Sequence, residues 1–228
     1  MSVVIHSVGP SAQSAPVARL PLWRFSVAQY HAMIRKGILV DGDPVELLDG
    51  LLVRKMTKNP PHRLATERTR RVLDAILPKG WHTQVQEVIA LPTSEPEPDV
   101  MVVRGELDDY PDRHPGPVDV ELVVEVADAS LSQDQGFKKR LYAEATVALY
   151  WIINLVDRRL EVYTEPTGPA SEPDYQAHRD FSPEDRVALV LNGREAGRIQ
   201  VGPVNLASQY SGHWASSSDM PSSAIAFS

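Results

Sequence analysis

Two carboxylates stand where the sequence makes a charge costly. Asp99 ends the stretch EPEPD and opens the apolar segment DVMVVRG, and Glu125 lies among the valines of DVELVVEV. A carboxylate left unpaired in a central strand costs several kcal/mol or stays protonated. We therefore expect a lysine, an arginine or a divalent metal ion to meet Glu125. Strand alternation predicts one face made of Asp119, Glu121, Val123 and Glu125, and an opposite face made of Val120, Leu122, Val124 and Val126.

If the two segments pair as strands, both carboxylates converge at one end of the sheet. Mg²⁺ or Mn²⁺ takes one or two such carboxylates and keeps several waters. A bound ion of this kind can activate a water molecule and polarise a phosphoryl oxygen. The alternative for each residue alone is structural, with Asp99 capping a strand entrance and Glu125 pairing with an arginine.

A helical segment, QGFKKRLYAEATVA, is predicted to point Lys138 inward. At about 100° per residue its apolar positions form one arc, which consists of Phe137, Leu141, Tyr142, Ala145 and Ala148. Lys138 falls inside this arc, whereas Lys139 falls on the solvent side. A lysine that faces a sheet is costly unless it meets a carboxylate. We therefore expect Lys138 to partner Glu125 or a substrate phosphate, the alternative being a lysine that extends along the surface to water.

Spacing and turn residues predict the elements that must position these groups. Ser26 and Gln29 suit a capping box for a helix that ends at Gly37, and Asp49-Gly50 suits a tight turn between two short strands. Further helices are predicted over residues 62–77 and 135–148, and strands over 81–91, 99–105, 119–127, 149–155 and 159–165, with a weaker pair over 185–191 and 197–201. This order predicts an α/β fold, in which helices flank a central mixed β-sheet and an N-terminal helix and hairpin extend it.

The helix over residues 62–77 has an apolar and a charged face. The apolar positions are Leu64, Ala65, Val72, Leu73, Ile76 and Leu77, and the opposite face carries Arg63, Glu67, Arg70, Arg71 and Asp74. The three arginines form a basic stripe, which is either a solvated helix face or a phosphate contact. His62 shares the inner face and is either structural or part of a site.

Composition limits the possible classes of protein. The chain has 228 residues, 43% of them hydrophobic, which suits one sizeable core. We expect a flexible arm over residues 1–20, a single domain over 21–205 and a disordered tail over 206–228. No segment reads as a membrane helix or a secretory signal, so we expect a cytoplasmic protein. Without cysteine there are no thiolate metal sites, and the net charge of −7 argues against binding nucleic acid through overall basic charge.

Several short motifs, in this order and spacing, resemble the Uma-two family. They are Pro-Asp at 98–99, Val-Glu-Val at 124–126, and GFKKRLYAEA leading to YWIINL, preceded by VELLDG and an Asn-Pro-Pro-His helix entry. The resemblance covers residues 23–165. It implies a restriction-endonuclease-like core of the PD-(D/E)XK superfamily, and an endonuclease that uses Mg²⁺ or Mn²⁺, acts on DNA and needs no small organic cofactor. A homodimer is a further possible assembly of this chain.

The resemblance also implies roles for individual residues. Asp99 and Glu125 would bind the metal ion together with the backbone carbonyl of Val126, and Lys138 would assist the attacking water. Glu46 would reach the metal through water, and His62 would contact a phosphate or the metal's water shell. The commoner superfamily pattern places the lysine two residues after the glutamate, where this chain has Ala127.

Two other functions stay open at this point. The first is a nuclease-like fold kept as a catalytically silent binding or dimerisation module. The second is a metal-dependent hydrolase of small phosphoesters.

Overall fold

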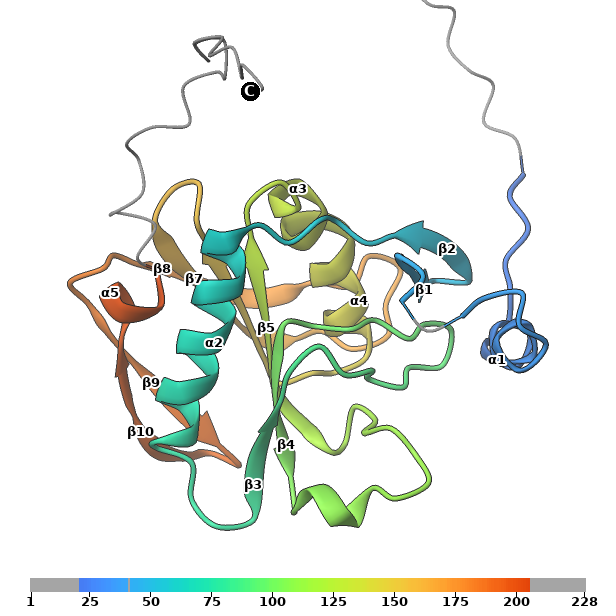
Figure 1. Ribbon diagram of the computed structural model, residues 1–228. Coiled ribbons are helices and arrows are strands. Elements are labelled where there is room, and N and C mark those ends of the chain that lie inside the picture. The colour runs from blue at the N-terminus through green and yellow to red at the C-terminus, as the bar shows by residue number, and fades with distance from the viewer. Residues whose placement is uncertain (1–20, 41, 206–228) are drawn as a thin grey trace, which may run out of the picture.

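The computed structural model describes residues 21–40 and 42–205, and the arm and tail predicted over 1–20 and 206–228 lie outside the described residues. A six-stranded sheet forms the centre, in the order β3-β4-β5-β6-β7-β8 (Figure 1). Its strands are β3 Trp81–Gln84, β4 Val100–Arg104, β5 Val120–Ala127, β6 Leu149–Asn154, β7 Arg159–Pro166 and β8 Tyr175–Phe181. The neighbours β5 and β6 are parallel and the other pairs antiparallel, which confirms the predicted central mixed sheet.

The predicted N-terminal extension is present at one side of the sheet (Figure 1). Helix α1 (Val27–Arg35) starts at Ser26, where the capping box with Gln29 is complete. Strands β1 (Val45–Leu48) and β2 (Leu51–Arg54) form a two-stranded hairpin. Asp49 and Gly50 have φ angles of 47° and 73°, as a two-residue turn with both residues left-handed requires.

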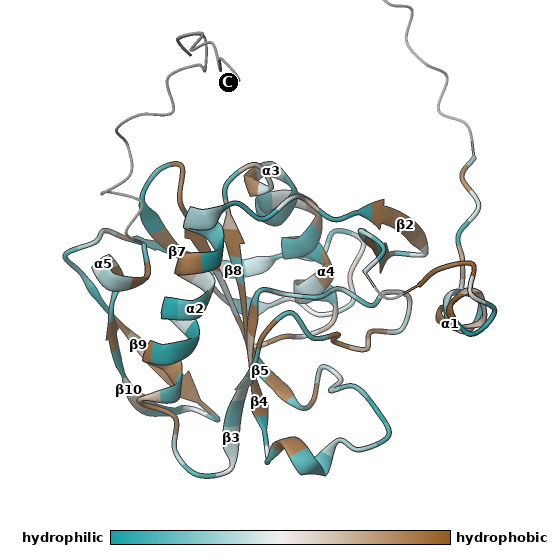
Figure 2. Ribbon diagram, in the orientation of Figure 1, coloured by the Kyte–Doolittle hydropathy of each residue, from teal (hydrophilic) through white to brown (hydrophobic). Residues whose placement is uncertain are grey.

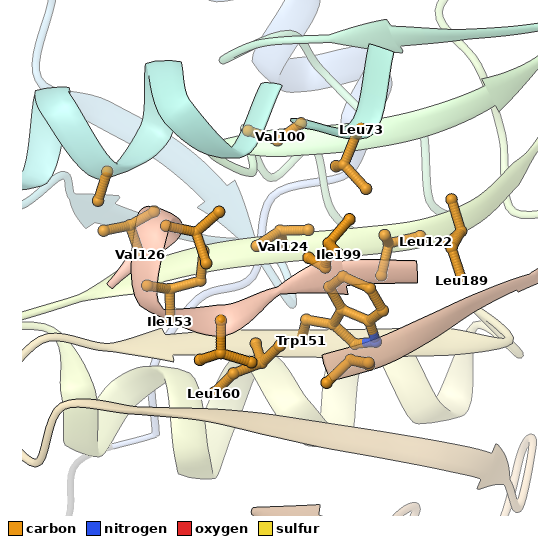
Figure 3. Packing of buried hydrophobic residues seen from close by; sticks show 14 of the residues in the cluster. Leu73, Val100, Leu122, Val124, Val126, Trp151, Ile153, Leu160, Leu189 and Ile199 are labelled. Carbon is orange, nitrogen blue, oxygen red and sulfur yellow. The ribbon is translucent and has the colours of Figure 1, made fainter. Parts of the chain in front are cut away.

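One face of the sheet is covered by α2 (Pro60–Asp74) and by a second hairpin of β9 (Arg186–Leu191) and β10 (Arg194–Gln200), followed by α5 (Val201–Val204). Leu73 of α2 packs in the same buried cluster as Trp151, with valines and leucines of β4 and β5 around them (Figure 3). At Gly197, β10 passes so close to the residues that follow α2 that an added β-carbon would lie 2.8 Å from Cβ of Ile76.

The opposite face packs against a helical segment with a change of geometry in its middle. It consists of α3 (Leu131–Gln133), the π-helical turn η2 (Asp134–Lys138) and α4 (Lys139–Glu144). Tyr142 and Tyr150 are fully buried here, with ring centroids 5.1 Å apart. Hydrophobic residues concentrate along β4 and β5, between the two layers (Figure 2). No helix in the described part of the chain has the length and apolar character to cross a membrane.

Several predicted boundaries were wrong. The strand expected over residues 81–91 ends at Gln84, because the chain then turns at Gln86, whose φ is 56°. The helix expected over 62–77 begins earlier, at Pro60 behind the cap Asn59, and ends at Asp74. The helix expected over 135–148 begins at Leu131 and ends at Glu144, with the π-helical turn inside it.

Two side chains face differently from their prediction, and one strand was missed. Val120 packs with Val123 rather than with Leu122, because the pairing with β4 shifts by one residue at this end of β5. Leu64 is 37% exposed. Strand β8 was missed because its sequence YQAHRDF has few apolar residues. The weaker strand pair after residue 185 is present as β9 and β10.

Candidate active site

The two carboxylates that the sequence singles out lie opposite each other. Strands β4 and β5 are antiparallel with Val100 paired to Val124, so Asp99, one residue before β4, faces Glu125. Asp99 is 5% exposed and Glu125 is 3% exposed. Oδ2 of Asp99 accepts a hydrogen bond of 2.9 Å from the N–H of Val126. The side chain of Asp99 thus accepts from the backbone of β5 just beyond the point where the backbone pairing of β4 and β5 ends.

Lys138 reaches Glu125 from the helical segment above the sheet. Its Nζ donates to Oε1 of Glu125 at 2.9 Å, and the hydroxyl of Tyr142 donates to the same oxygen at 2.9 Å. Burial raises the pKa of Glu125 to about 8, although the ammonium of Lys138 opposes this shift. Burial alone would lower the pKa of Lys138, but the carboxylates around it outweigh burial and raise this pKa above its usual value.

The turn η2 explains how a lysine can be buried here. This π-helical turn begins at Asp134 and ends at Lys138, and the side chains of both residues are buried. Lys139, the next residue, pairs instead with Asp174, at 2.8 Å, and is only partly exposed. The sequence-based prediction that Lys138 points inward therefore agrees with the structure, while Lys139 is less solvated than expected.

Glu46 also faces this centre. It lies on β1 with 4% exposure, and its Oε1 is 3.8 Å from Nζ of Lys138. Its Oε2 accepts a hydrogen bond of 3.3 Å from the N–H of Glu97. A bridge between Leu47 and Glu95 holds β1 beside the EPEPD segment. The N-terminal hairpin thus supplies one wall of the site.

His62 comes from the first turn of α2. Its Nε2 lies 3.1 Å from Oδ2 of Asp99. The cap Asn59 fixes this turn in two directions, since its Oδ1 accepts from the N–H of His62 at 3.0 Å and its Nδ2 donates to Asp128 at 2.6 Å. Asp128 directly follows β5, so the start of α2 is tied to the strand that carries Glu125 (Figure 1).

Asp134 is a further buried carboxylate of the cleft, and its place there is not among the residues predicted from the sequence. It is 1% exposed, and within the described part of the chain neither of its oxygens has a hydrogen-bond partner. Burial raises its pKa to about 6. Its Oδ1 lies 3.9 Å from Nζ of Lys138. The spacing of four residues before an inward lysine was the available sequence signal.

These side chains line a cleft with about 690 Å³ of empty space, partly open to solvent. Its deep wall carries four buried carboxylates, which belong to Glu46, Asp99, Glu125 and Asp134. Around its mouth lie Lys55, Lys58 and Glu97, with Lys55 and Glu97 paired at 2.5 Å. Four carboxyl groups face one ammonium and one imidazole in this wall, so acidic groups outnumber basic ones, and such a set of oxygen ligands suits a cation.

The donor atoms of the cleft fit a small divalent ion. The hydrogen bonds to Asp99 and Glu125 fall on Oδ2 and Oε1, which leaves Oδ1 and Oε2 without a hydrogen bond from the described residues. Carboxylate oxygens with room for waters are the ligands that Mg²⁺ and Mn²⁺ take. Since N–H and C=O of one strand residue point to the same side, the carbonyl of Val126 is directed toward Asp99 as well.

A second acidic group lies elsewhere on the sheet. Glu161, His178 and Asp180 offer ligand atoms within 4.8 Å of one another, and no other such set of three occurs among the described residues. The guanidinium of Arg159 already lies 3.1 Å from Glu161 and 3.4 Å from Asp180. This positive charge occupies the place that an ion would need.

The basic stripe on α2 is largely paired within the helix. Arg70 contacts Glu67 and Asp74 at 2.9 and 2.6 Å, and Arg71 contacts Glu67 at 2.7 Å. Spacings of three and four residues are those of ordinary surface ion pairs on a helix. Of the two interpretations, the solvated helix face agrees with these contacts for Arg70 and Arg71.

Comparisons with known proteins bear on the family and the fold of this chain. The family model described as "Uma2: Putative restriction endonuclease" matches residues 27–198. No curated protein matches the chain. A crystal structure described as "a putative nuclease belonging to DUF820" from Anabaena variabilis is similar with a TM-score of 0.57 and 14% sequence identity, covering 74% of this chain and 94% of that chain. This likeness is one of fold, and it confirms the predicted fold class.

Proposed function

This chain belongs to the Uma2 family, and we propose that it is a divalent-metal-dependent endonuclease that hydrolyses DNA phosphodiester bonds. One observation carries the proposal. Asp99 and Glu125 face each other from adjacent strands in a cleft, and each keeps one oxygen free of hydrogen bonds from the described residues. Lys138, bound to the other oxygen of Glu125, supplies the positive charge that phosphoryl transfer requires.

Each residue of the cleft has a distinct part in this proposal. Asp99, Glu125 and the carbonyl of Val126 would hold the ion, which when bound activates water and polarises a phosphoryl oxygen. Lys138 stabilises negative charge on the phosphorus centre, and Tyr142 fixes Glu125 by sharing the same oxygen. His62, which lies against Asp99, would hold its orientation, and Glu46, which lies near Lys138, would bind a water of the ion.

The substrate is proposed from the charge at the mouth of the cleft. Lys58 is exposed there and forms no ion pair with the described residues, so it is free to contact a backbone phosphate. A net charge of −7 argues that such local contacts and the ion, rather than overall basic charge, hold the nucleic acid. A cytoplasmic location and the pairing of two copies of the chain stay predictions.

A cleavage assay tests the function directly. Purified protein is incubated with single-stranded, duplex and supercoiled DNA in Mg²⁺, in Mn²⁺ and in EDTA. We expect cleavage that needs the ion and that falls by at least about a hundredfold in Asp99→Asn and in Glu125→Gln, because each variant loses a charged ligand. Asp119→Asn is a matched control, since Asp119 pairs with Arg113 outside the cleft and its loss should leave cleavage unchanged.

Two outcomes would contradict the proposal. If the wild type cuts no DNA under any of these conditions but binds Mg²⁺ and hydrolyses a small phosphoester, the substrate class is wrong. If it neither cuts nor binds an ion, the nuclease fold serves here as a catalytically silent binding or dimerisation module.

A further inference from the structure

Among the carboxylates of the cleft, only that of Asp134 accepts no hydrogen bond from the described residues, and its one ion-pair contact among them is the long one to Lys138. Both of its oxygens are buried and lack a hydrogen-bond partner among the described residues. It lines the cleft beside Glu125 and Lys138. Burying a carboxylate without a partner costs several kcal/mol, so a group that lies close by should be able to reach it.

Lys138 is the group in reach. Its Nζ donates to Glu125 at 2.9 Å and stands 3.9 Å from Oδ1 of Asp134. That second distance is only about 1 Å longer than a hydrogen bond between an ammonium and a carboxylate. The two residues are four positions apart on one helical segment. A lysine side chain has four rotatable bonds and three N–H donors, so it can change partners without movement of the backbone. A small rotation of the side chain therefore changes its partner.

We propose that Asp134 is a positioning residue, which receives the ammonium of Lys138 when a divalent ion is bound to Glu125. The ammonium and an ion on the same carboxylate repel each other. Moving the ammonium to Asp134 frees Glu125 and keeps the positive charge in the cleft. This inference rests on the proposed function to the extent that it needs an ion at Asp99 and Glu125.

Glu46 is a poorer acceptor for the displaced lysine. Its Oε1 is 3.8 Å from Nζ, nearly the same distance, but its Oε2 is already bound to the N–H of Glu97. Both oxygens of Asp134 lack a hydrogen-bond partner among the described residues. A hydrogen bond from Lys138 would therefore offset the desolvation of Asp134, whereas Glu46 already has a hydrogen bond.

Calorimetric titration with Mg²⁺ and with Mn²⁺, without DNA, tests the exchange through a double-mutant cycle. The proteins are the wild type, Asp134→Asn, Lys138→Met and the double variant. We expect Asp134→Asn to weaken the affinity about tenfold, because the lysine then stays on Glu125. Once Lys138 is absent, adding Asp134→Asn should change the affinity less than about twofold. Equal effects of Asp134→Asn in both backgrounds would overturn the proposal, since they would mean that Asp134 acts on the ion without the lysine.

A spectroscopic measurement covers the case in which Lys138→Met does not fold. In protein with ¹⁵N-labelled lysine side chains, Mg²⁺ should shift the ammonium resonance of Lys138 in the wild type and leave it sharp, whereas in Asp134→Asn it should broaden. An unchanged resonance on adding saturating Mg²⁺ to the wild type would overturn the exchange.

Glu97→Gln is the control for charge. This variant loses one negative charge from the same cleft, but the lost carboxylate pairs with Lys55 and not with Lys138. The Mg²⁺ affinity of the variant protein should therefore stay within about twofold of the wild type. A loss equal to that of Asp134→Asn would contradict the proposal. If the wild type binds Mg²⁺ and Asp134→Asn binds it equally well, the exchange fails while the proposed function stands. If the wild type binds no ion at all, both fail.

Discussion

One oxygen of Glu125 accepts two hydrogen bonds at the centre of the cleft. Oε1 of Glu125 receives both the ammonium of Lys138 and the hydroxyl of Tyr142, so the other oxygen faces the cleft without a hydrogen bond from the described residues. Burial and the neighbouring carboxylate of Glu125 hold the pKa of Tyr142 well above its usual value, so this hydroxyl stays a donor. These two hydrogen bonds fix the orientation of the Glu125 carboxylate and leave its second oxygen available.

The contact between His62 and Asp99 leads to a prediction at this scale. His62→Ala should lower the cleavage rate by about 10- to 100-fold, as is usual when a group that orients a metal ligand is lost. Steady-state kinetics in Mg²⁺ measure the effect, which should fall mainly on kcat. His82→Ala is the matched control, because His82 bonds to the carbonyl of Gly105, away from the cleft. Equal rates for both variants and the wild type would contradict the role.

The sequence predicts some of these residues and not others for a physical reason. Asp99, Glu125 and Lys138 each break an apolar pattern, so their cost is visible without a structure. Asp134 lies in a polar stretch, LSQDQG, where a carboxylate looks ordinary. Its burial depends on the π-helical turn, which regular helical spacing does not predict.

At the scale of elements, Glu161 joins the sheet to the helical segment that carries the lysine. It is fully buried on β7, and its two oxygens accept from Gln135 of η2, from Asn154 and from Tyr163, with Arg159 beside them. Burial alone would raise the pKa of Glu161, but these hydrogen bonds outweigh burial and lower it.

We predict that Glu161→Gln destabilises the fold by about 2 to 4 kcal/mol at pH 7. Because the pKa of Glu161 is lower in the folded state than its ordinary value of 4.5, its contribution is present above pH 4.5 and is lost as the pH falls through the lower, folded value. Urea unfolding between pH 3 and 7 should therefore show the difference between variant and wild type shrinking toward acid pH.

Glu165→Gln serves as the control for this experiment. Glu165 is exposed on the same strand, so its replacement should change stability by less than about 0.5 kcal/mol. A destabilisation of Glu161→Gln that stays constant across the pH range would show that shape, and not charge, explains it.

Elements were predictable where a local signal specifies them. The capping box of α1 and the Asp49-Gly50 turn are local, and both are as predicted. The partnership of strands is not local. The one-residue shift that turns Val120 to the other face arises from pairing with β4, and β8 owes its place to β7 rather than to its own apolar content. Leu64 is exposed because the face of α2 that packs against the sheet covers a narrower arc of the helix than its apolar residues do.

At the scale of the whole molecule, the proposed ion site can form only in the folded chain. Its carboxylates come from strands distant in sequence, and its lysine comes from a third element. A ligand that binds only the folded state stabilises it by about 2.7 kcal/mol at a hundred times its Kd.

Saturating Mg²⁺ should therefore raise the Tm by about 5 to 10 °C, since each kcal/mol shifts a domain of this size by roughly 2 to 4 °C. Differential scanning calorimetry in EDTA and in Mg²⁺ measures the shift. Asp99→Asn should remove most of it, and a shift of equal size in that variant would place the stabilising ion elsewhere.

The contact at Gly197 has a consequence for how wide the opening of the cleft can be. Ile76, two residues after the end of α2, lies directly against β10 at residue 197, and a methyl group there would push Ile76 away. Ile76 directly follows α2, and a helix of fifteen residues moves nearly as a rod, so a displacement of Ile76 that pulls on the helix also moves its first turn, which borders the mouth. Position 197, remote from every reacting group, is thus a point from which the aperture of the cleft can be adjusted.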